Sequence, residues 1–264
     1  MARSLVINWE DEMNIFVVNL KKSVEKRQKL EAQFQKLGIQ QYEFIEAVYG
    51  ADLSEEDLAT KVYDYENCAL TPGEIGCSLS HIYIYQEMID RNIPYALVIE
   101  DDVTLPEDLI EFLNHAKATI DVPYSKLITL GEANKISLLR EYSQYKDYRE
   151  YTAVTAFCTY AYLVNLEAAK SLSQQLLPVK YEADMLIHFR ENGWLKQFNV
   201  FYPQYIHPME GFSEMSDLKD IRRPFKRQRH EYKKKFLKQR PLGIRIKNRI
   251  MRAIWKIRQI KPKK

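Results

Sequence analysis

Three consecutive carboxylates, Glu100-Asp101-Asp102, carry the most evident chemistry in this sequence. They directly follow Tyr95–Ile99, a short apolar run typical of a buried strand in an α/β sheet. Adjacent carboxylates repel one another, so gathering them there is costly. Ligands of open α/β sheets bind beyond the carboxyl ends of strands, and hard divalent cations prefer oxygen ligands. The pattern therefore favours a cation that holds a diphosphate; a solvated turn before Pro106 is the alternative.

A second motif, TPGEIGCSLSH at Thr71–His81, has the signature of a helix start. Thr71 can cap the helix, Pro72 suits its first position, and Glu74 completes a capping box. We expect this helix to continue to about Arg91, because Pro94 follows.

Two glycines and two polar residues suggest that this helix also binds something. Gly73 and Gly76 lie in its first turns, where each glycine costs up to about 1 kcal/mol relative to alanine. A close approach of another group would explain them, and the N–H groups of a helix N-terminus can bind an anion or a sugar hydroxyl. Ser80 and His81 would face the same region, although a single histidine more often has a structural role.

Strands and helices are expected to alternate along the chain. The expected strands are 14–20, 41–47, 95–99, 126–130, 153–164 (one strand or a bent pair) and 197–202, and the expected helices are 21–37, 71–91, 106–118, 165–177 and 182–191. The strand–helix–strand opening implies a parallel pair with a right-handed crossover. We therefore predict one α/β domain over residues 13–218.

Composition excludes several classes of protein. A chain of 264 residues with 46% hydrophobic content can bury a full core. No run approaches the roughly 20 apolar residues of a membrane helix. The three cysteines show no CxxC or Cys/His zinc spacing, and their odd number suits a reducing compartment. Residues 1–12 lack the regions of a signal peptide, so we interpret them as a leader or an upstream extension.

The net charge of +3 conceals a division of charge along the chain. Residues 1–218 carry a formal charge of −15, whereas residues 219–264 carry +18. Within that arm, Leu242–Ile260 places isoleucines on one helical stripe between Arg and Lys residues, and Trp255 points away from the stripe. A basic amphipathic helix is typical of contact with a membrane surface or a partner's groove. A solvated basic tail is the alternative.

Three motifs in this order resemble glycosyltransferase family 25: VVNLKKSVEKR near the start, TPGEIGCSLSH, and ALVIEDDV. That family comprises lipooligosaccharide galactosyl- and glucosyltransferases of Gram-negative bacteria, with relatives that glycosylate collagen. The resemblance covers roughly Asn14–Asp217. It implies a GT-A-like fold, that is, a single Rossmann-like nucleotide-sugar-binding domain with an Asp-x-Asp-type metal motif, to which the basic helical arm is a C-terminal extension.

The resemblance also implies a divalent metal, Mn²⁺ or Mg²⁺. Asp102 would bind it, and Glu100 or Asp101 would meet the ribose or a second metal position. The middle acid departs from a plain Asp-x-Asp motif, so the division of roles between them stays open. His207, after the last expected strand, would complete the metal shell; a structural loop histidine is the alternative.

Further residues are expected to contact the nucleotide sugar. Arg27 would lie near the uracil or a phosphate. The alternative is that its charge is solvated on the helix surface. The closing Ser216-Asp217 would border the site. The expected nucleotide-sugar contacts are Asn19, Leu20, Arg27, Glu74, Ser80, His81, Glu100, Asp101, Gly131 and Glu132.

An inverting transferase needs a carboxylate base that takes the proton of the acceptor hydroxyl. Asp184 is the first candidate, since it follows a Pro178 loop and opens a short helix as the acidic position of the family does. Glu182 and Glu132 are reserves. A charge that stabilises the helix N-terminus is the alternative role for Asp184.

The sequence thus predicts a metal-dependent, inverting glycosyltransferase that moves galactose or glucose from a UDP-sugar to a sugar of bacterial lipooligosaccharide or lipopolysaccharide. The alternative is a non-catalytic protein that binds carbohydrate or an anionic surface. A glycoside hydrolase would need paired carboxylates without a nucleotide site, and the acidic body argues against nucleic acid. We expect the protein in the cytoplasm of a Gram-negative bacterium, with the arm contacting the anionic face of the inner membrane.

Overall fold

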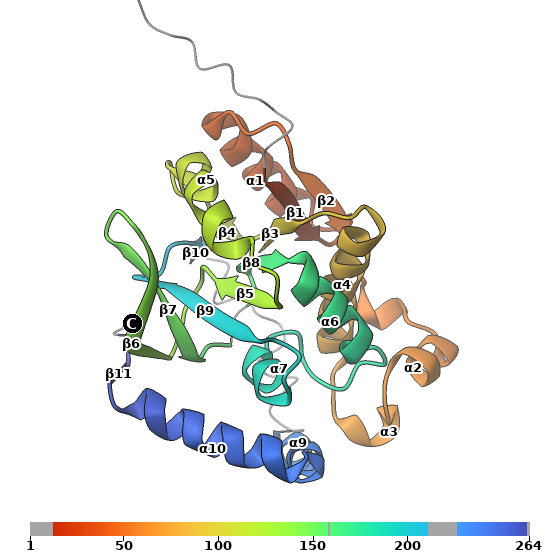
Figure 1. Ribbon diagram of the computed structural model, residues 1–264. Coiled ribbons are helices and arrows are strands. Elements are labelled where there is room, and N and C mark those ends of the chain that lie inside the picture. Colours follow the sequence, from red (N-terminus) through yellow and green to blue (C-terminus); the bar gives the residue numbers. More distant parts are fainter. Residues whose placement is uncertain (1–12, 158, 211–225, 263–264) are drawn as a thin grey trace, which may run out of the picture.

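A nine-stranded mixed sheet forms the centre of the computed structural model, which describes residues 13–157, 159–210 and 226–262 (Figure 1). The strand order is β11-β6-β7-β9-β5-β8-β3-β1-β2, and β4 pairs separately with β10. The strands are β1 (Asn14–Asn19), β2 (Glu43–Glu46), β3 (Tyr95–Glu100), β4 (Val103–Thr104), β5 (Lys126–Thr129), β6 (Lys135–Tyr145), β7 (Tyr148–Thr155), β8 (Ala161–Asn165), β9 (Gln197–Tyr202), β10 (His207–Pro208) and β11 (Gln259–Ile260).

Helices cover both faces of this sheet. Because successive side chains of a strand point to opposite faces, Val98 packs with α4 and α6 whereas Ile99 packs with α1 and α5. The α/β prediction is therefore confirmed. The helices are α1 (Val24–Leu37), α2 (Glu55–Lys61), α3 (Tyr65–Cys68), α4 (Pro72–Asp90), α5 (Leu109–Ile120), α6 (Leu166–Leu176), α7 (Leu186–Asn192), α9 (Lys226–Gln239) and α10 (Leu242–Lys256), with a 3₁₀ turn, η2, at Gly50–Asp52.

The direction of the strands creates one edge where their carboxyl ends meet. Strand β1 is parallel to β2 and β3, and β5 is parallel to β9. Strand β8 runs antiparallel between β3 and β5, so its amino end lies at that same edge. The triple carboxylate ends β3, and the segment Leu130-Gly131-Glu132 follows β5. The fold thus brings these two motifs to one edge of the sheet.

The predicted start of α4 is confirmed in detail. The Glu74 backbone N–H donates to Thr71 Oγ1 over 3.3 Å, and the Thr71 N–H donates to Glu74 Oε2 over 2.8 Å. Pro72 stands at the start of the helix. This reciprocal capping box satisfies two N–H groups that would otherwise lack a partner.

A group does approach α4 closely at Gly76, and it is the protein's own backbone. A Cβ atom at Gly76 would overlap the carbonyl oxygen of Val48 and lie 2.8 Å from the Gly50 nitrogen. Ser80, one turn later, accepts a hydrogen bond from the Val48 N–H over 2.9 Å. The glycine therefore lets the segment after β2 pack directly on the helix.

The expected elements match the structure to within a few residues, and the structure has further elements that were not expected. The region expected as one strand or a bent pair at 153–164 is the end of β7 and all of β8. A polar hairpin of β6 and β7 precedes it and was not expected, nor were α2 and α3. The weakly patterned segment 219–240 contains a regular helix, α9.

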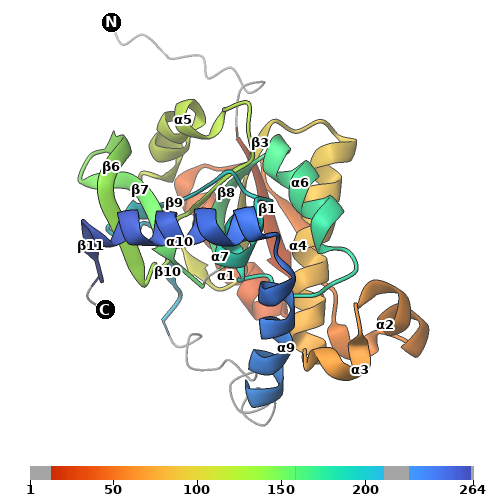
Figure 2. The same ribbon diagram turned by 60° about the horizontal axis from the view of Figure 1, so that its bottom comes forward.

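The C-terminal arm packs on the body, as Figure 2 shows for α9 beside α4. Strand β11 extends the sheet next to β6, with Ile260 opposite Ile136. Trp255, which the sequence predicted to point away from the isoleucine stripe, contacts the body: the centroid of its ring lies 4.2 Å from the Arg190 guanidinium carbon. Four basic residues of the arm pair with body carboxylates, so part of the charge division is neutralised within the chain: Arg229, Lys233, Arg240 and Arg252.

Some sequence predictions concern residues that the structure does not describe. These are the leader at residues 1–12 and the closing Ser216-Asp217. The boundary at residue 218 also falls there, so the division into body and arm stays a prediction. Among the helices of the described ranges, none has the length and apolar character needed to cross a bilayer.

Candidate active site at the carboxyl edge of the sheet

The carboxylates after β3 are held by residues that follow β1. Because β1 and β3 are parallel neighbours, with Val18 opposite Glu100, Asn19 lies beside Asp101. The Asn19 amide donates to Asp101 Oδ2 over 2.7 Å, and both residues are buried. Leu20 ends this segment, and its carbonyl accepts the Ser23 N–H that leads into α1. The structure thus brings together two of the predicted contacts from distant parts of the chain.

A lysine that the sequence analysis missed lies between two of the carboxylates. Lys26 Nζ, in the first turn of α1, is 3.3 Å from Asp101 Oδ1 and 3.1 Å from Asp102 Oδ2. Although burial lowers it, these carboxylates raise the pKa of Lys26 above its ordinary value. Burial also raises the pKa of Asp101, even though Lys26 and Asn19 oppose that effect. The only signal in the sequence was the position of Lys26 beside Arg27.

Arg27 points elsewhere. Its Nε donates to Glu31 over 3.0 Å on the exposed side of α1, and its guanidinium lies 4.2 Å from the Phe44 ring centroid. This placement favours the alternative of a solvated helix charge; a role in nucleotide binding stays a prediction.

Glu100 contacts α4 and the loop before β8. Thr159 Oγ1 donates to Glu100 Oε1 over 3.0 Å, and His81 Nε2 lies 3.7 Å from the same oxygen. Although burial raises it, the His81 and Thr159 contacts hold the pKa of Glu100 below its ordinary value. His81 is therefore part of this edge, as expected, whereas Ser80 is fully buried at the junction with Val48.

Tyr160 connects the ends of β3 and β5. Its carbonyl accepts the Glu100 N–H over 2.9 Å, and its hydroxyl accepts the Glu132 N–H over 2.9 Å. A Cβ atom at Gly131 would lie 2.6 Å from the Tyr160 ring, so a larger residue there would displace that ring. Gly131 and Glu132 are thus connected to the carboxylate motif through a single residue, Tyr160.

The loop after β9 returns to the carboxylates. His207 pairs opposite Thr104, and the Met209 N–H donates to the Asp102 carbonyl over 2.6 Å. His207 is exposed and lies two residues along from Asp102 in this ladder. The ladder thus brings this segment beside the motif, and the role of His207 as a metal ligand stays a prediction.

Glu74 and Glu182 belong to a buried ion cluster under α9. Arg229 Nη1 and Nη2 lie 2.7 and 2.8 Å from the two Glu74 carboxylate oxygens. Lys233 Nζ donates to Glu182 Oε1 over 2.6 Å. Both residues are more than nine-tenths buried, and each carboxylate is paired with a cationic side chain of α9. Asp184, two residues beyond, has a partly exposed side chain.

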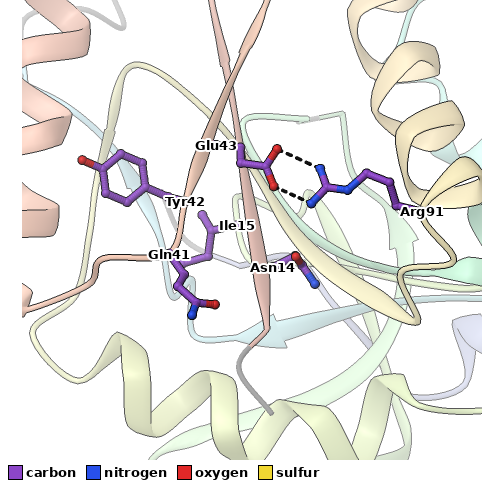
Figure 3. A pocket seen from close by; sticks show the side chains of 6 residues that line it. All are labelled: Asn14, Ile15, Gln41, Tyr42, Glu43 and Arg91. Carbon is purple, nitrogen blue, oxygen red and sulfur yellow. Dashed lines mark hydrogen bonds and ion pairs between the residues drawn. The ribbon is translucent and has the colours of Figure 1, made fainter. Parts of the chain in front are cut away.

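A surface pocket lies at the opposite edge of the sheet, at the amino ends of β1 and β2 (Figure 3). The Arg91 guanidinium forms a two-point ion pair with Glu43, with N···O distances of 2.8 and 2.7 Å. The lining contains none of the predicted site residues: it is Asn14, Ile15, Gln41, Tyr42, Glu43 and Arg91.

The residues at the carboxyl edge fit a hard divalent cation. Asp101 and Asp102 supply oxygen ligands, and the Lys26 ammonium lies between them, as a cation would. Asp102 is partly exposed, so an ion can reach it. The identity of the metal is not fixed by these contacts, because Mn²⁺ and Mg²⁺ accept the same ligands.

Comparisons with known proteins point to one family. A sequence model described as glycosyltransferase family 25 (LPS biosynthesis protein) matches residues 12–187. A glycosyltransferase 25 family member of Aedes aegypti is 28% identical over 243 residues, which cover 80% of this chain and 38% of that one. The Drosophila melanogaster counterpart is 31% identical over 173 residues, which cover 60% and 27%.

Human procollagen galactosyltransferase 2 is 26% identical over 231 residues, which cover 78% of this chain and 37% of that one. The chain therefore spans about a third of the length of these curated relatives. Among solved structures, a glycosyltransferase involved in glycosylation of the major capsid of PBCV-1 matches 72% of this chain and 80% of that chain. It does so with 11% identity and a TM-score of 0.37.

Proposed function

This chain belongs to glycosyltransferase family 25, and from that premise we propose that it transfers galactose or glucose from a UDP-sugar to a glycan acceptor. The observation that carries the proposal is the carboxylate group after β3, which Asn19 and Lys26 hold at the carboxyl edge of the sheet. That edge is where α/β proteins bind nucleotides.

Asp102, with Glu100 or Asp101, would hold Mn²⁺ or Mg²⁺, with His207 next to them. When bound, such an ion supplies neutralising charge to the departing diphosphate. Asn19 fixes the Asp101 carboxylate through a buried hydrogen bond, so that oxygen cannot rotate away from the site. Tyr160 and Gly131 form the neighbouring wall, where the tyrosine ring packs on the glycine.

An inverting reaction requires a carboxylate that takes the acceptor proton. Glu182 is poorly suited because Lys233 donates to it and Arg229 lies 3.5 Å away. Two candidates with partly exposed side chains remain, Asp184 and Glu132. We propose Asp184 first, and Glu132 is the alternative at the end of β5.

We further propose a lipid-linked acceptor of the lipooligosaccharide type, met at the anionic cytoplasmic face of a Gram-negative inner membrane. The support is α10, whose apolar stripe stays exposed although the helix packs on α7 and β6 (Figure 2). The exposed fractions of Ile246 and Ile250 are 51% and 54%. Basic side chains that flank the stripe are exposed as well: Arg245, Lys247, Arg249 and Lys256. Each would contribute about 1 kcal/mol near an anionic surface.

The function is tested by UDP release from UDP-galactose and UDP-glucose, with and without Mn²⁺, for the wild type and Asp102→Ala. A truncated lipooligosaccharide serves as acceptor, and its omission as control. We expect metal-dependent release with one donor that the variant loses. Should UDP neither be released nor bind, the alternative of a non-catalytic carbohydrate- or surface-binding protein would replace the proposal.

A further inference from the structure

Three side chains of different chemistry converge where α4 meets the end of β3. Cys77 and His81 are four residues apart, so they lie on the same face of α4. That face is turned toward Glu100. The Cys77 thiol, a His81 ring nitrogen and a Glu100 carboxylate oxygen all lie within 4.8 Å of one another.

One of these atoms is a buried ring nitrogen that has no hydrogen-bond partner. His81 is 2% exposed, and its Nε2 has no hydrogen-bond partner among the residues that the structure describes. The nearest charged atom is Glu100 Oε1 at 3.7 Å. Leaving a buried polar nitrogen unsatisfied costs about 1–3 kcal/mol, so such an atom calls for an explanation.

The other ring nitrogen is held by a fixed partner. His81 Nδ1 lies 2.8 Å from the Tyr162 hydroxyl, which in turn lies 3.1 Å from the Tyr85 hydroxyl. Both tyrosines are almost fully buried. When Nδ1 carries the proton and donates to Tyr162, the lone pair of Nε2 points toward Cys77 and Glu100. A hydrogen bond at the second nitrogen is the usual means of orienting a metal-binding histidine.

We propose that Cys77, His81 and Glu100 bind a borderline-soft divalent cation of the Zn²⁺ class, at a site distinct from the oxygen ligands around Asp102. One sulfur, one imidazole and one carboxylate are the ligands that zinc prefers. Tetrahedral zinc keeps such donor atoms about 3.3–3.8 Å apart. The His81–Glu100 distance of 3.7 Å already meets that requirement, and the Cys77 sulfur lies within 4.8 Å of both groups.

The two sites share Glu100, which has a consequence for catalysis that rests on the proposed function. A cation held by Cys77 and His81 draws Glu100 toward α4 and away from Asp102. Zinc would therefore lower the Mn²⁺-supported transfer of sugar. Through Glu100, binding of the soft metal would then directly affect the site that binds the sugar donor.

Cobalt(II) absorbance tests the site without relying on activity, because a thiolate ligand gives Co²⁺ an intense near-ultraviolet charge-transfer band. The full chain is titrated with Co²⁺, and so are Cys77→Ser, the double variant Cys68→Ser/Cys158→Ser, and Asp102→Asn. We expect one equivalent of Co²⁺ to produce the band in the wild type, in the double variant and in Asp102→Asn. We expect Cys77→Ser to lose it while keeping the wild-type melting temperature.

Absence of the band in the wild type would overturn the proposal, and so would its persistence in Cys77→Ser. Loss of the band in Asp102→Asn would show that the ligands belong to a single mixed site, which also contradicts the proposal. Zinc inhibition of UDP release, present in the wild type and absent in Cys77→Ser, then tests the shared carboxylate. A failure of transferase activity itself leaves the cobalt result intact, so the two failures are distinguishable.

Discussion

Lys26 Nζ lies 3.1 Å from Asp102 Oδ2, although 76 residues separate the two in the sequence. The same ammonium reaches Asp101 at 3.3 Å. A cation that belongs to the protein therefore occupies the space between the carboxylates to which we assign a divalent metal. Lys26 offsets part of the charge of the two carboxylates, and a metal must compete with it.

Replacing Lys26 with methionine should strengthen the binding of Mn²⁺ in the absence of nucleotide. The substitution keeps the length of the side chain and removes the competing charge. We expect a gain of up to about tenfold, equivalent to about 1.4 kcal/mol, because the pair is only partly buried. Calorimetric titration with Mn²⁺ measures it. Lys29→Met, which removes an exposed pair with Glu25 on the same helix, is the matched control. Weaker Mn²⁺ binding by Lys26→Met would show that Lys26 supports the metal.

The ion cluster under α9 should be needed for stability. Arg229 is 9% exposed and pairs with Glu74, which is 2% exposed, so Arg229→Met leaves a buried carboxylate without its cation. Breaking such a pair costs about 3–5 kcal/mol. Urea denaturation measures the free energy of unfolding.

Arg227→Met is the matched control for that change. Arg227 pairs with Glu231 on the exposed side of the same helix, where such pairs contribute about 0–1 kcal/mol. Adding Glu74→Gln to Arg229→Met should recover part of the loss, since it removes the unpaired charge. Equal stability of Arg229→Met and Arg227→Met would refute the role of the cluster.

Acid should loosen the contact between α7 and the arm. Burial, helped by the Arg240 charge, lowers the pKa of His188 to about 4, and Arg240 Nη2 donates to His188 Nδ1 over 3.2 Å. The unfolded imidazole titrates near 6.5. A neutral His188 therefore contributes stability that is complete above pH 6.5 and is lost as the pH falls toward 4. The melting temperature should fall across that window, and His188→Asn should make the fall shallower. Parallel curves for the two proteins would be the contrary result.

The apolar stripe of α10 should bind anionic vesicles. We expect Ile246→Ser/Ile250→Ser to abolish sedimentation with phosphatidylglycerol vesicles and to change the free energy of unfolding by no more than about 0.5 kcal/mol. The stability should hold because both side chains are half exposed. Ile110→Ser, at an exposed position of α5, controls for a general loss of apolar surface. Undiminished binding by the double variant would refute a membrane role for the stripe.

Local signals in the sequence predicted the parts of the fold that local chemistry determines. The capping box of Thr71 and Glu74 depends on residues three apart, so their types alone indicate it. The strand before Glu100 is a continuous apolar run, as a strand buried on both faces requires. The β6–β7 hairpin was missed because its residues are largely polar and half exposed, without clear alternation.

Contacts between distant residues could not be predicted in this way. Arg229 lies 155 residues from Glu74, and a basic arm gave no sign that its first helix would be buried against the body. Gly76 illustrates the same limit, since the sequence indicated a close approach but not that Val48 and Gly50 make it. The group of Cys77, His81 and Glu100 was also missed, because the cysteines show no recognised zinc spacing in the sequence and Glu100 joins the other two only through the tertiary fold.

The central claim is that the carboxylate edge binds a metal–nucleotide complex. Calorimetric titration with UDP, with and without Mn²⁺, tests it most directly because no acceptor is required. We predict that the wild type binds UDP in Mn²⁺, and that removal of the metal or Asp102→Asn weakens binding at least about tenfold. Asp121→Asn, an exposed change after α5, should bind like the wild type. UDP binding of equal affinity in Asp102→Asn and in the absence of metal would contradict the account.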